Sequence, residues 1–503
     1  MRRDEPAAAP LSDELRQALP GLPPLTGLTA DSRAVGPGFL FVALPGAKAD
    51  GRAFIPDAVA RGAVAVLGPE GTAWPEGVPA RPLLTAADPR RLLALLAAEF
   101  HGAQPATVVA MTGTNGKTST VDFLRQIWLR DGLLAASLGT LGLVTEGMAP
   151  GPSLTTPDPV ALHAMLASLS QAGVTHAAME ASSHGIEQRR LDGVHLAAAG
   201  FSNLTRDHLD YHGTMAAYRA AKLRLFDTLL PPGATAVVNA DMEAASLGAL
   251  RGIAQARGLR LITVGESAAD LRLVAQRPCP DGQEIEVTAF GTKATLHLPL
   301  PGRFQADNAL MAAALAIACG MVPARALALL PGLAGVRGRM ELAARLPNGA
   351  AAYVDYAHTP DALERLLAAL RPHVAPGARL HVLFGAGGDR DPGKRPLMGA
   401  AAARLADRVW ITDDNPRSED PAMIRAAVMA GCPGAMDAGD RAGAIARALA
   451  ALGPGDVLVV AGKGHESGQT IGGVTHPFDD IAVVRAAIHP DRAGAPEACG
   501  VQP

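Results

Sequence analysis

The amino-acid sequence predicts an α/β protein with three domains, and two observations lead to that prediction. The chain is 503 residues long, enough for about three domains of ordinary size. Short apolar runs alternate with helical patterns, which favours mostly parallel sheets covered by helices on both faces. We expect a small N-terminal α/β domain (1–101), a central parallel-sheet domain with a phosphate loop (102–335) and a C-terminal Rossmann-like domain (336–503).

The N-terminal block mixes short strands with turns. Its pattern predicts strands at 38–44 and 64–67 and helices at 55–61 and 90–100. His101-Gly102-Ala103-Gln104-Pro105 is typical of a linker and is expected to end this domain.

The second block begins with an apolar strand, 108–111, that leads into Thr112-Gly113-Thr114-Asn115-Gly116-Lys117-Thr118-Ser119 and then a helix. A strand, a glycine turn and a helix N-terminus together direct backbone N–H groups at one spot, which favours an anion there. Lys117 is expected to reach the outer phosphates of a nucleotide, and the Thr118 hydroxyl to bind Mg²⁺. The general phosphate loop has Gly at the position of Met111, so only its second half matches. A simple glycine turn is the alternative, but the Gly-Lys-Thr ending favours phosphate binding.

Further strands are predicted at 176–179 and 196–199. Glu180 ends the first of them, where a carboxylate close to a phosphate loop could bind Mg²⁺ directly or through water; a helix-capping acid is the alternative. The apolar run Ala309–Val322 is shorter than a membrane span and predicts a buried core helix.

A helix is predicted after Gly213, capped by Thr214 and stopped by Pro231-Pro232-Gly233. Lys222 lies on its apolar stripe, which consists of Met215, Tyr218, Leu225, Phe226 and Leu229. A lysine at the edge of such a stripe usually extends its charge into water, whereas one facing the core must be paired, neutral or chemically modified. His208, in the preceding loop, has the character of a surface histidine when considered alone.

The third block predicts four strands, at 351–354, 380–384, 409–412 and 457–460. Each is followed by a polar cluster, at 355–358, 385–390, 413–417 and 462–466. Because ligands of open α/β sheets bind outside the carboxyl ends of strands, these clusters are expected on one rim. Arg390 and Arg417 in them suit carboxylates or phosphates. The segment around Lys463 could be mistaken for a second phosphate loop. It lacks the glycine spacing of such a loop and the Ser or Thr after the lysine, so we do not predict a phosphate site there.

Composition and charge argue against several classes of protein. A net charge of −3 and a pI near 6.5 argue against a nucleic-acid binder. The four cysteines, Cys279, Cys319, Cys432 and Cys499, have no zinc or disulfide spacing and are expected to be reduced thiols. The N-terminus shows no apolar signal segment. We therefore expect a cytoplasmic protein without membrane insertion. We also expect a monomer.

Taken together, several motifs resemble those of the Mur ligases, and within them the MurE group. The motifs are Asp31-Ser32-Arg33, Gly113 to Thr118, Leu154-Thr155-Thr156-Pro157, 180–184, 203–213, 355–360 and 387–390. The resemblance extends from Asp31 to about Ile488 and explains the short phosphate loop. It implies an ATP-dependent, amide-bond-forming ligase of peptidoglycan precursor synthesis.

The resemblance also implies roles for individual residues. UDP-N-acetylmuramoyl-L-alanyl-D-glutamate would be contacted by Ser32, Thr155, Thr156, Ser182, Gln188 and Arg190. ATP would be bound by Gly113, Thr114, Asn115, Gly116, Lys117, Thr118 and Ser119, with Asn308 and Asp355 near the adenine and ribose. Mg²⁺ ions would be held by Thr118, Glu180, His208 and Lys222, the last as a carbamate; Lys117, Lys222 and His208 would be catalytic. The incoming meso-2,6-diaminopimelate would meet Arg390, Asp414, Asn415, Pro416, Arg417, Gly462 and Glu466. Gln305 occupies a position where the family usually has Asn. This difference affects the prediction of one contact with the nucleotide.

The implied reaction has two steps. The D-glutamate γ-carboxylate attacks the ATP γ-phosphorus to give an acyl phosphate and ADP, and the amine of diaminopimelate then displaces phosphate. Three alternatives are a lysine-adding form of the enzyme, folylpolyglutamate synthase and a nucleotide-binding regulatory module. Folylpolyglutamate synthase lacks the domain that carries Asp31-Ser32-Arg33 here, which argues against that alternative. A regulatory module needs no acceptor pocket, so the complete polar rim of the third block argues against that one. A surface ion pair of Arg417 with Glu419 or Asp420 is the simple alternative to a role in amino-acid binding.

Overall fold

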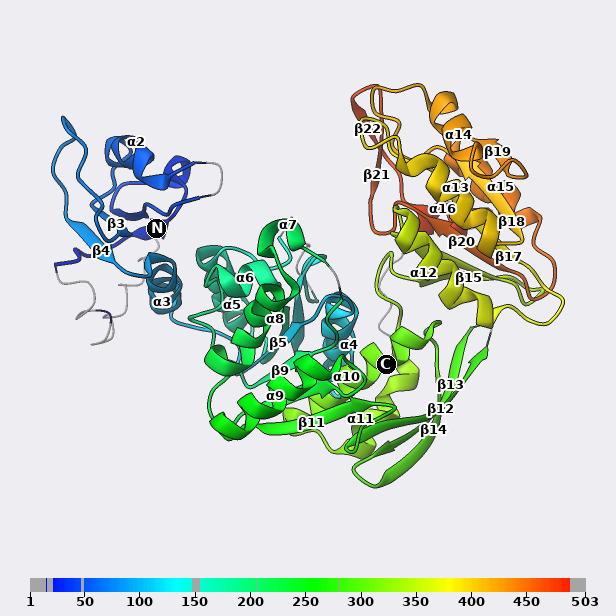
Figure 1. Ribbon diagram of the computed structural model, residues 1–503, viewed down its shortest axis with the longest axis horizontal. Helices are drawn as coiled ribbons and strands as arrows, with labels where there is room; N and C mark the ends of the chain where they lie inside the picture. Colours follow the sequence, from blue (N-terminus) through cyan, green and yellow to red (C-terminus); the bar gives the residue numbers. More distant parts are fainter. Residues whose placement is uncertain are drawn as a thin grey trace, which may run out of the picture. The chain divides into compact units, whose positions relative to one another are not determined.

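The computed structural model describes residues 15, 21–46, 49–146, 154–205, 207–279 and 281–488. The chain separates into two compact units, residues 1–271 with 311–326 and residues 272–310 with 327–503. Their described parts consist of mainly parallel sheets covered by helices, which confirms the predicted α/β class (Figure 1).

A four-stranded parallel sheet forms the N-terminal part of the first unit, in the order β1-β2-β3-β4. Its strands are β1 (Gly27–Thr29), β2 (Phe39–Val42), β3 (Ala65–Pro69) and β4 (Leu83–Ala86). Its helices are η1 (Ser32–Ala34), η2 (Gly51–Phe54), α2 (Ile55–Ala60) and α3 (Pro89–His101). Leu40 and Val42 pack with α3, whereas Phe41 and Ala43 pack with α2, as expected when successive side chains of a strand point to opposite faces. The four elements predicted here are confirmed to within about two residues at each end.

Seven strands of the first unit belong to a second sheet, in which they follow the order β11-β10-β9-β5-β8-β6-β7. They are β5 (Thr107–Thr112), β6 (Ala135–Gly139), β7 (Gly142–Val144), β8 (His176–Glu180), β9 (Ala198–Phe201), β10 (Thr235–Asn239) and β11 (Arg260–Gly265). Every neighbouring pair is parallel except β6 and β7. The accompanying helices are α4 (Lys117–Arg130), α5 (Pro159–Gln171), α6 (Ser183–Glu187), α7 (Leu209–His212), α8 (Met215–Arg224), η3 (Leu225–Leu229) and α9 (Ala244–Arg257).

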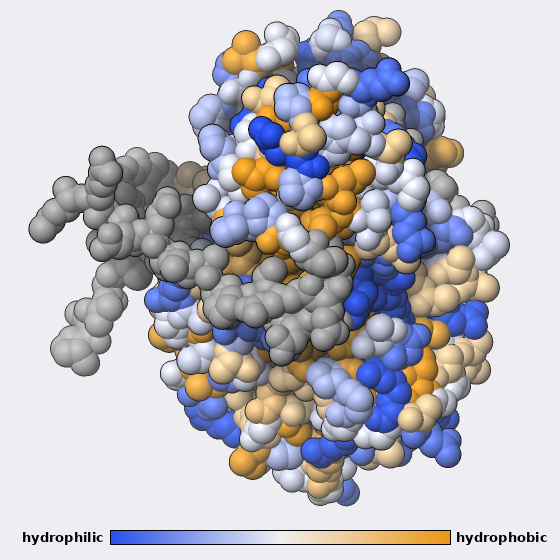
Figure 2. Space-filling model, turned by 90° about the vertical axis from the view of Figure 1, so that its left-hand side faces the viewer, coloured by the Kyte–Doolittle hydropathy of each residue, from blue (hydrophilic) through white to orange (hydrophobic). Residues whose placement is uncertain are grey.

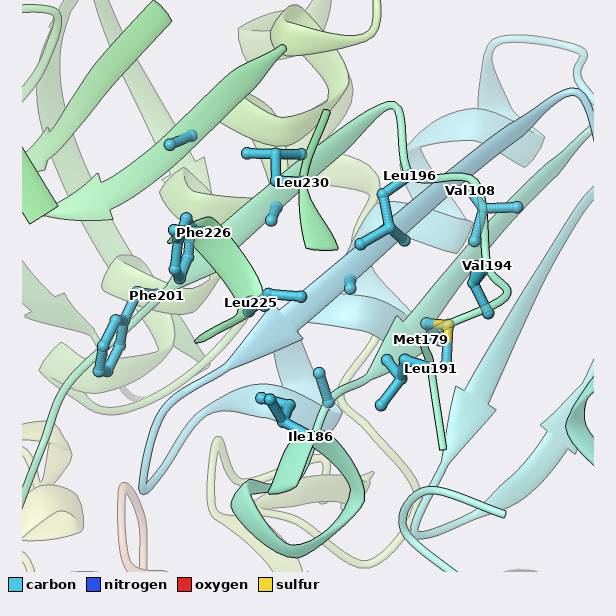
Figure 3. Close-up of a cluster of buried hydrophobic side chains, with 14 of the residues drawn as sticks. Val108, Met179, Ile186, Leu191, Val194, Leu196, Phe201, Leu225, Phe226 and Leu230 are labelled. Carbon is cyan, nitrogen blue, oxygen red and sulfur yellow. The ribbon is translucent and has the colours of Figure 1, made fainter. Parts of the chain in front are cut away.

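Helices cover both faces of this sheet. On one face, Val108, Met179 and Phe201 from three strands form a buried cluster with Phe226 and Leu230, as Figure 3 shows. Helix α4 contacts β5, β6 and β8 but contributes no residue to that cluster, so it lies on the opposite face. This is the arrangement predicted from the alternation of strands and helices.

The predicted core helix at 309–322 is α10 (Arg303–Ala318), which is shorter at its C-terminal end. Cys319 to Val322 form a turn, Val322 is 65% exposed, and Pro323 begins α11 (Pro323–Leu329). The apolar run thus joins the end of a core helix to an exposed turn. Apolar composition alone does not locate this helix end, because Gly320 at φ 103° introduces the break.

In its described residues, the second unit contains three groups of paired strands. Strands β12 (Leu271–Cys279), β13 (Gly282–Ala289) and β14 (Thr292–Leu298) lie side by side, the last two antiparallel. The C-terminal sheet has the order β15-β16-β20-β17-β18-β19 and is parallel except for the pair β15–β16. Its strands are β15 (Glu341–Arg345), β16 (Ala351–Asp355), β17 (Leu380–Phe384), β18 (Arg408–Thr412), β19 (Met436–Gly439) and β20 (Val457–Ala461), and a hairpin of β21 (Gly468–Ile471) and β22 (Val474–Pro477) follows.

Alternate residues of the C-terminal strands enter two different cores. Tyr353 and Phe384 pack with the first group of helices, whereas Val354 and Leu383 pack with the second. The first group is α12 (Pro360–Leu370), α13 (Lys394–Leu405) and α14 (Pro421–Met429); the second is α15 (Arg441–Ala450) and α16 (Asp480–Ile488). The four strands predicted in this block are confirmed, and their carboxyl ends lie on one rim, because β16, β20, β17 and β18 run parallel.

None of the helices in the described part of the chain combines the length and apolarity of a membrane span. On the face shown in Figure 2, hydrophobic residues are interspersed with hydrophilic ones. Cys279, Cys319 and Cys432 are free thiols, and Cys499 lies outside the described residues.

Candidate active site

The predicted phosphate loop joins β5 to α4, which begins at Lys117. Gly113 has φ 141°, and a Cβ there would lie 2.0 Å from the Ser202 Oγ. Gly116 has φ 87° and is the N-cap of α4. Both glycines thus allow backbone conformations that other residues rarely adopt. The strand, turn and helix predicted from the sequence are confirmed.

A neighbouring segment after β9 holds the loop in place. The Thr114 N–H donates to the Asn203 carbonyl (2.8 Å), the Asn115 N–H donates to Asn203 Oδ1 (3.0 Å), and the Ser202 hydroxyl donates to the Asn115 carbonyl (2.6 Å). Ser202 and Asn203 were not among the predicted site residues. Their position at the carboxyl end of β9, next to β5 in the sheet, is the signal that could have identified them.

Two lysines converge on one carbonyl oxygen of the loop. Lys222 Nζ donates to the Gly113 carbonyl at 2.8 Å, and Lys117 Nζ donates to it at 2.9 Å and to the Thr114 carbonyl at 2.9 Å. Lys222 is only 1% exposed. Burial, with repulsion from Lys117 as a smaller cause, holds the pKa of Lys222 well below its ordinary value. The Lys222 amine is therefore biased toward its neutral, nucleophilic form.

The prediction of a helix with Lys222 facing the core is confirmed, with one difference in the backbone. Lys222 Nζ lies over the Tyr218 ring, 4.6 Å from its centroid. Directly after α8, residues 225–229 form a π-helical turn, η3, rather than a continued α-helix. Such turns widen the helix locally and often occur at functional sites.

Glu180 is the last residue of β8 and is 1% exposed. Its carboxylate accepts hydrogen bonds from the Thr118 hydroxyl (2.9 Å) and the Thr140 N–H (2.7 Å). The alternative of a helix-capping acid does not hold, because Ser182 caps α6. Thr140 was not predicted; the preceding Gly139 is the signal, since a Cβ at Gly139 would lie 2.0 Å from Glu180 Oε1.

The surroundings of Glu180 fit a divalent cation. Among the described residues no basic side chain forms an ion pair with it, so its negative charge is buried without a cationic partner. The described part of the chain also has no group of three or more His, Cys, Asp or Glu arranged to hold a metal. Mg²⁺ needs none, because it is usually bound by one or two carboxylates together with water and substrate phosphates.

His208 has φ 51° and a half-exposed side chain, 3.4 Å from Asp207. Its ring meets that of His184 edge to face at 5.0 Å, and the Tyr218 ring lies 6.1 Å away. Tyr218 in turn packs against the Lys222 amine. His208 thus lies one ring away from Lys222, and its role in metal binding stays a prediction.

Five of the six residues predicted to bind the UDP precursor form one network. Thr156 Oγ1 lies 3.0 Å from Ser182 Oγ, Arg190 donates to the Thr156 carbonyl (2.6 Å), and Arg190 also donates to Gln188 Oε1 (2.7 Å). Thr155 Oγ1 lies 3.2 Å from Thr140 Oγ1, and through Thr140 the network reaches Glu180.

The sixth residue, Ser32, lies in η1 of the four-stranded sheet. Asp31 caps this turn by accepting the Arg33 N–H, and the two side chains form an ion pair at 2.7 Å. Hydrogen bonds from Arg33 lower the pKa of Asp31. Asp31 and Arg33 therefore shape the turn that carries Ser32.

In the second unit, Asp355 ends β16 and accepts the N–H groups of Met340 and Ala357, both at 2.7 Å. Burial raises its pKa. Asn308 donates to Gln305 Oε1 (3.0 Å), and both residues are buried. Gln305, the departure from the family pattern, thus orients the Asn308 amide.

The residues predicted to bind the incoming amino acid meet at the rim of the C-terminal sheet. Asp414 and Asn415 follow β18, and Gly462 and Glu466 follow β20. The Asn415 amide donates to Glu466 Oε2 at 3.0 Å. Gly462 has φ 116°, and a Cβ there would lie 2.6 Å from Asp414 Oδ2. Two segments 48 residues apart, measured from Asp414 to Gly462, are therefore in direct contact.

Arg417 belongs to the same rim and has φ 53°. Its guanidinium donates to the Gly388 carbonyl at 2.6 Å. The alternative of a surface ion pair with Glu419 or Asp420 does not hold: Glu419 pairs with Arg395 at 2.8 Å, and Asp420 caps α14.

Gly387 and Gly388, which follow β17, leave room for the turn at Pro416 and Arg417. A Cβ at Gly388 would lie 1.9 Å from the Pro416 carbonyl oxygen, and one at Gly387 would lie 2.9 Å from an Arg417 nitrogen. Arg390, three residues after Gly387, is exposed. The rim thus brings together guanidinium groups, on Arg390 and Arg417, and carboxylates, among them those of Asp414 and Glu466.

Most of the chain is similar to known protein families. Three family models match: the Mur ligase family catalytic domain (24–101), the Mur ligase middle domain (111–316) and the Mur ligase glutamate ligase domain (338–464). A UDP-N-acetylmuramoyl-L-alanyl-D-glutamate–2,6-diaminopimelate ligase of Caulobacter vibrioides is 54% identical, over 95% of this chain and 98% of that protein.

Solved structures are similar as well. A structure of a UDP-N-acetylmuramoyl-L-alanyl-D-glutamate–2,6-diaminopimelate ligase is 35% identical, with a TM-score of 0.72, and the match covers 93% of this chain and 95% of that one. Folylpolyglutamate synthase of Mycobacterium tuberculosis, solved with ADP, is 18% identical with a TM-score of 0.57, covering 80% of this chain and 94% of that one; it shares the fold alone. The family models and the identity to the Caulobacter protein show that this chain belongs to the Mur ligase family.

Proposed function

We propose that this protein is the ATP-dependent ligase that joins meso-2,6-diaminopimelate to the D-glutamate γ-carboxylate of UDP-N-acetylmuramoyl-L-alanyl-D-glutamate, in peptidoglycan precursor synthesis. The observation that carries the proposal is the rim of the C-terminal sheet, where Asp414, Asn415, Arg417 and Glu466 meet. An amino acid with both an ammonium and a carboxylate at its distal end needs acids and a guanidinium side by side. The 54% identical relative is a ligase named for the same pair of substrates, which supports the proposal.

The phosphate loop supports the first chemical step. The γ-carboxylate of the precursor attacks the γ-phosphorus of ATP, ADP leaves, and an acyl phosphate forms. Lys117 is proposed to move from the loop carbonyls that it now contacts to the phosphates, where its charge offsets the charge of the transferring group. The amine of diaminopimelate then attacks the acyl carbon, and phosphate leaves.

Mg²⁺ is proposed to be held by Thr118 and Glu180, and a second ion by His208 and a carbamate on Lys222. When bound, the ions would neutralise phosphate charge. The buried Glu180 carboxylate beside the Thr118 hydroxyl supports the first site. The buried Lys222 amine, biased toward its neutral form, supports the carbamate, because only a neutral amine reacts with CO₂.

A ligation assay tests the proposal. The purified protein is given ATP, Mg²⁺ and the UDP-dipeptide, with meso-diaminopimelate and L-lysine offered side by side. We expect the diaminopimelate tripeptide as the main product, with one ADP per peptide bond. A lysine product would indicate the lysine-adding form, and ATP binding without any amide product would indicate a regulatory module.

The same proposal has consequences for location and assembly. We propose a cytoplasmic monomer; the use of ATP and the free thiols of the described residues support the location. We propose domain boundaries near residues 101 and 335.

A further inference from the structure

Lys463 is fully buried at the rim of the C-terminal sheet. It lies between two glycines in the left-handed region, Gly462 at φ 116° and Gly464 at φ 55°. A Cβ at Gly464 would lie 2.6 Å from the Tyr356 Cβ. The chain therefore turns tightly at both sides of Lys463, and its side chain points into the protein rather than toward solvent.

The ammonium of Lys463 contacts three groups of the proposed amino-acid pocket. It donates to Asn415 Oδ1 at 3.0 Å and to Glu466 Oε2 at 3.2 Å, and it lies 4.0 Å from Asp414 Oδ1. Two carboxylates thus share one buried cation. Without that cation, the negative charges of the largely buried Asp414 and the partly exposed Glu466 would face each other without compensation.

The same contacts determine which way the Asn415 amide faces. An ammonium and a backbone N–H can only donate. Both Lys463 Nζ and the Thr470 N–H lie 3.0 Å from one terminal atom of Asn415, which must therefore be its oxygen. The amide nitrogen is then directed to Glu466 Oε2 at 3.0 Å. An amide nitrogen carries two N–H groups, and the described contacts use one of them.

We propose that Lys463 is a positioning residue for the incoming amino acid: it orients the Asn415 amide and holds Glu466 and Asp414 so that these groups meet the distal carboxylate and ammonium of diaminopimelate. This inference rests on the proposed function. In it, Asn415 presents its second N–H to the substrate carboxylate. Glu466 Oε2 is held by Lys463 and Asn415, and Glu466 Oε1 is available to accept from the substrate ammonium.

The Lys463→Met variant tests this role, because methionine fills a similar volume without charge or N–H donors. We expect the KM for diaminopimelate to rise roughly ten- to hundredfold, as when one partner of a buried polar group is removed. The KM values for ATP and for the UDP precursor should stay within about twofold, and selectivity over lysine should fall. Lys293→Met, on an exposed part of β14, is the matched control and should leave all three KM values unchanged.

A double-mutant cycle with Asn415→Ala separates positioning from general damage. If Lys463 acts through Asn415, the double variant should bind diaminopimelate little worse than Asn415→Ala alone. Fully additive losses, or a rise in all three KM values, would overturn the inference. Should Lys463→Met fail to fold, Lys463→Gln carries the test, since it retains a polar group but loses the charge between the two acids. An unchanged KM for diaminopimelate in either folded variant also overturns it.

Failure of the inference and failure of the proposed function give different results. If the wild-type protein does not ligate diaminopimelate, the proposed function is wrong. If the wild-type protein does so and the folded Lys463 variants match it in the KM for diaminopimelate, only the role of Lys463 is wrong.

Discussion

Lys117 and Lys222 donate hydrogen bonds to the same backbone oxygen, the carbonyl of Gly113, although they are 105 residues apart, counted from 117 to 222. Burial is the main cost of the charge on Lys222, and repulsion from the nearby Lys117 ammonium adds to it. The structure relieves this by favouring a neutral Lys222. A neutral, buried lysine beside a phosphate loop is suited to chemical modification, which leads to the first prediction.

Lys222→Ala should reduce turnover by about 10²-fold or more, because the proposed carbamate supplies a negatively charged ligand for Mg²⁺. Adding formate or acetate should restore part of the activity by replacing the lost carboxylate-like group. Activity of the wild-type protein should also depend on bicarbonate and rise with pH through the range where Lys222 loses its proton, since its pKa is lowered. Lys293→Ala is the control. Full activity of the Lys222 variant would exclude this lysine from the mechanism.

Lys117→Ala should abolish acyl-phosphate formation, with a loss of about 10²- to 10³-fold or more in turnover. Binding of the UDP precursor should be largely retained, because the network of Thr156, Gln188 and Arg190 does not include Lys117. The measurements are ADP release in single-turnover experiments and precursor binding by calorimetry. Lost precursor binding with persisting ATP use would contradict the assignment of the loop to ATP.

Arg417→Ala should reduce the selectivity for meso-diaminopimelate over lysine. The guanidinium can meet the distal carboxylate with two parallel hydrogen bonds, and sites built around a polar group reject analogues lacking it by roughly 10⁴-fold or more. The measurement is kcat/KM for both amino acids in the wild type, in Arg417→Ala and in Arg408→Ala, an exposed control at the start of β18. Comparable efficiency with lysine in the unaltered enzyme would show that Arg417 does not select the substrate.

Gly139→Ala should specifically weaken the binding of Mg²⁺. The added Cβ would lie 2.0 Å from Glu180 Oε1, so the carboxylate must move away from the Thr118 hydroxyl. We expect the Mg²⁺ concentration for half-maximal activity to rise several-fold, about as expected for the loss of one charge-assisted contact. Gly248→Ala, in helix α9 with open space around it, is the control and should be neutral or slightly stabilising. An unchanged Mg²⁺ requirement in a folded Gly139→Ala would remove Glu180 from the proposed site.

His163 should make the protein less stable in acid. Burial, with repulsion from His101 and His195, lowers the pKa of His163 from 6.5 to about 4. Between these values the unfolded chain binds a proton that the folded chain does not, so stability is lost as pH falls from about 6.5 to about 4. The shift corresponds to about 3 kcal/mol at 1.36 kcal/mol per pKa unit. The free energy of unfolding, measured with urea at pH 7 and at pH 4.5, should depend less on pH in His163→Leu than in the wild type. Equal pH dependence would contradict the burial argument.

Local features of the sequence were sufficient to predict much of the fold. The strand, glycine turn and helix at 107–130 are confirmed because their signals lie within neighbouring residues: apolar β-branched residues, then glycines, then a helical pattern. The four strands of the C-terminal block are confirmed for the same reason. That Lys222 faces the core was also predictable from the local sequence, because residues three and four positions apart lie on the same face of a helix.

Other elements have weak local signals. Strands β1, β6 and β7 are three to five residues long, and their assignment depends on pairing with partners elsewhere in the chain. The π-helical turn at 225–229 and the end of α10 at Ala318 were likewise not predicted. In each case tertiary packing decides between backbone conformations that differ little in local energy.

By itself, the sequence determined the phosphate loop, the strand ends that carry polar residues and the identity of the chemical groups available. Only the tertiary structure decided which groups meet: Lys222 with Gly113, Thr140 with Glu180, and Lys463 with Asn415. The physical reason is that periodicity and turn chemistry act over a few residues, whereas these contacts join segments between 40 and 109 residues apart. Such pairs depend on strand order and on the direction of buried side chains, which are settled when the sheets and helices pack together.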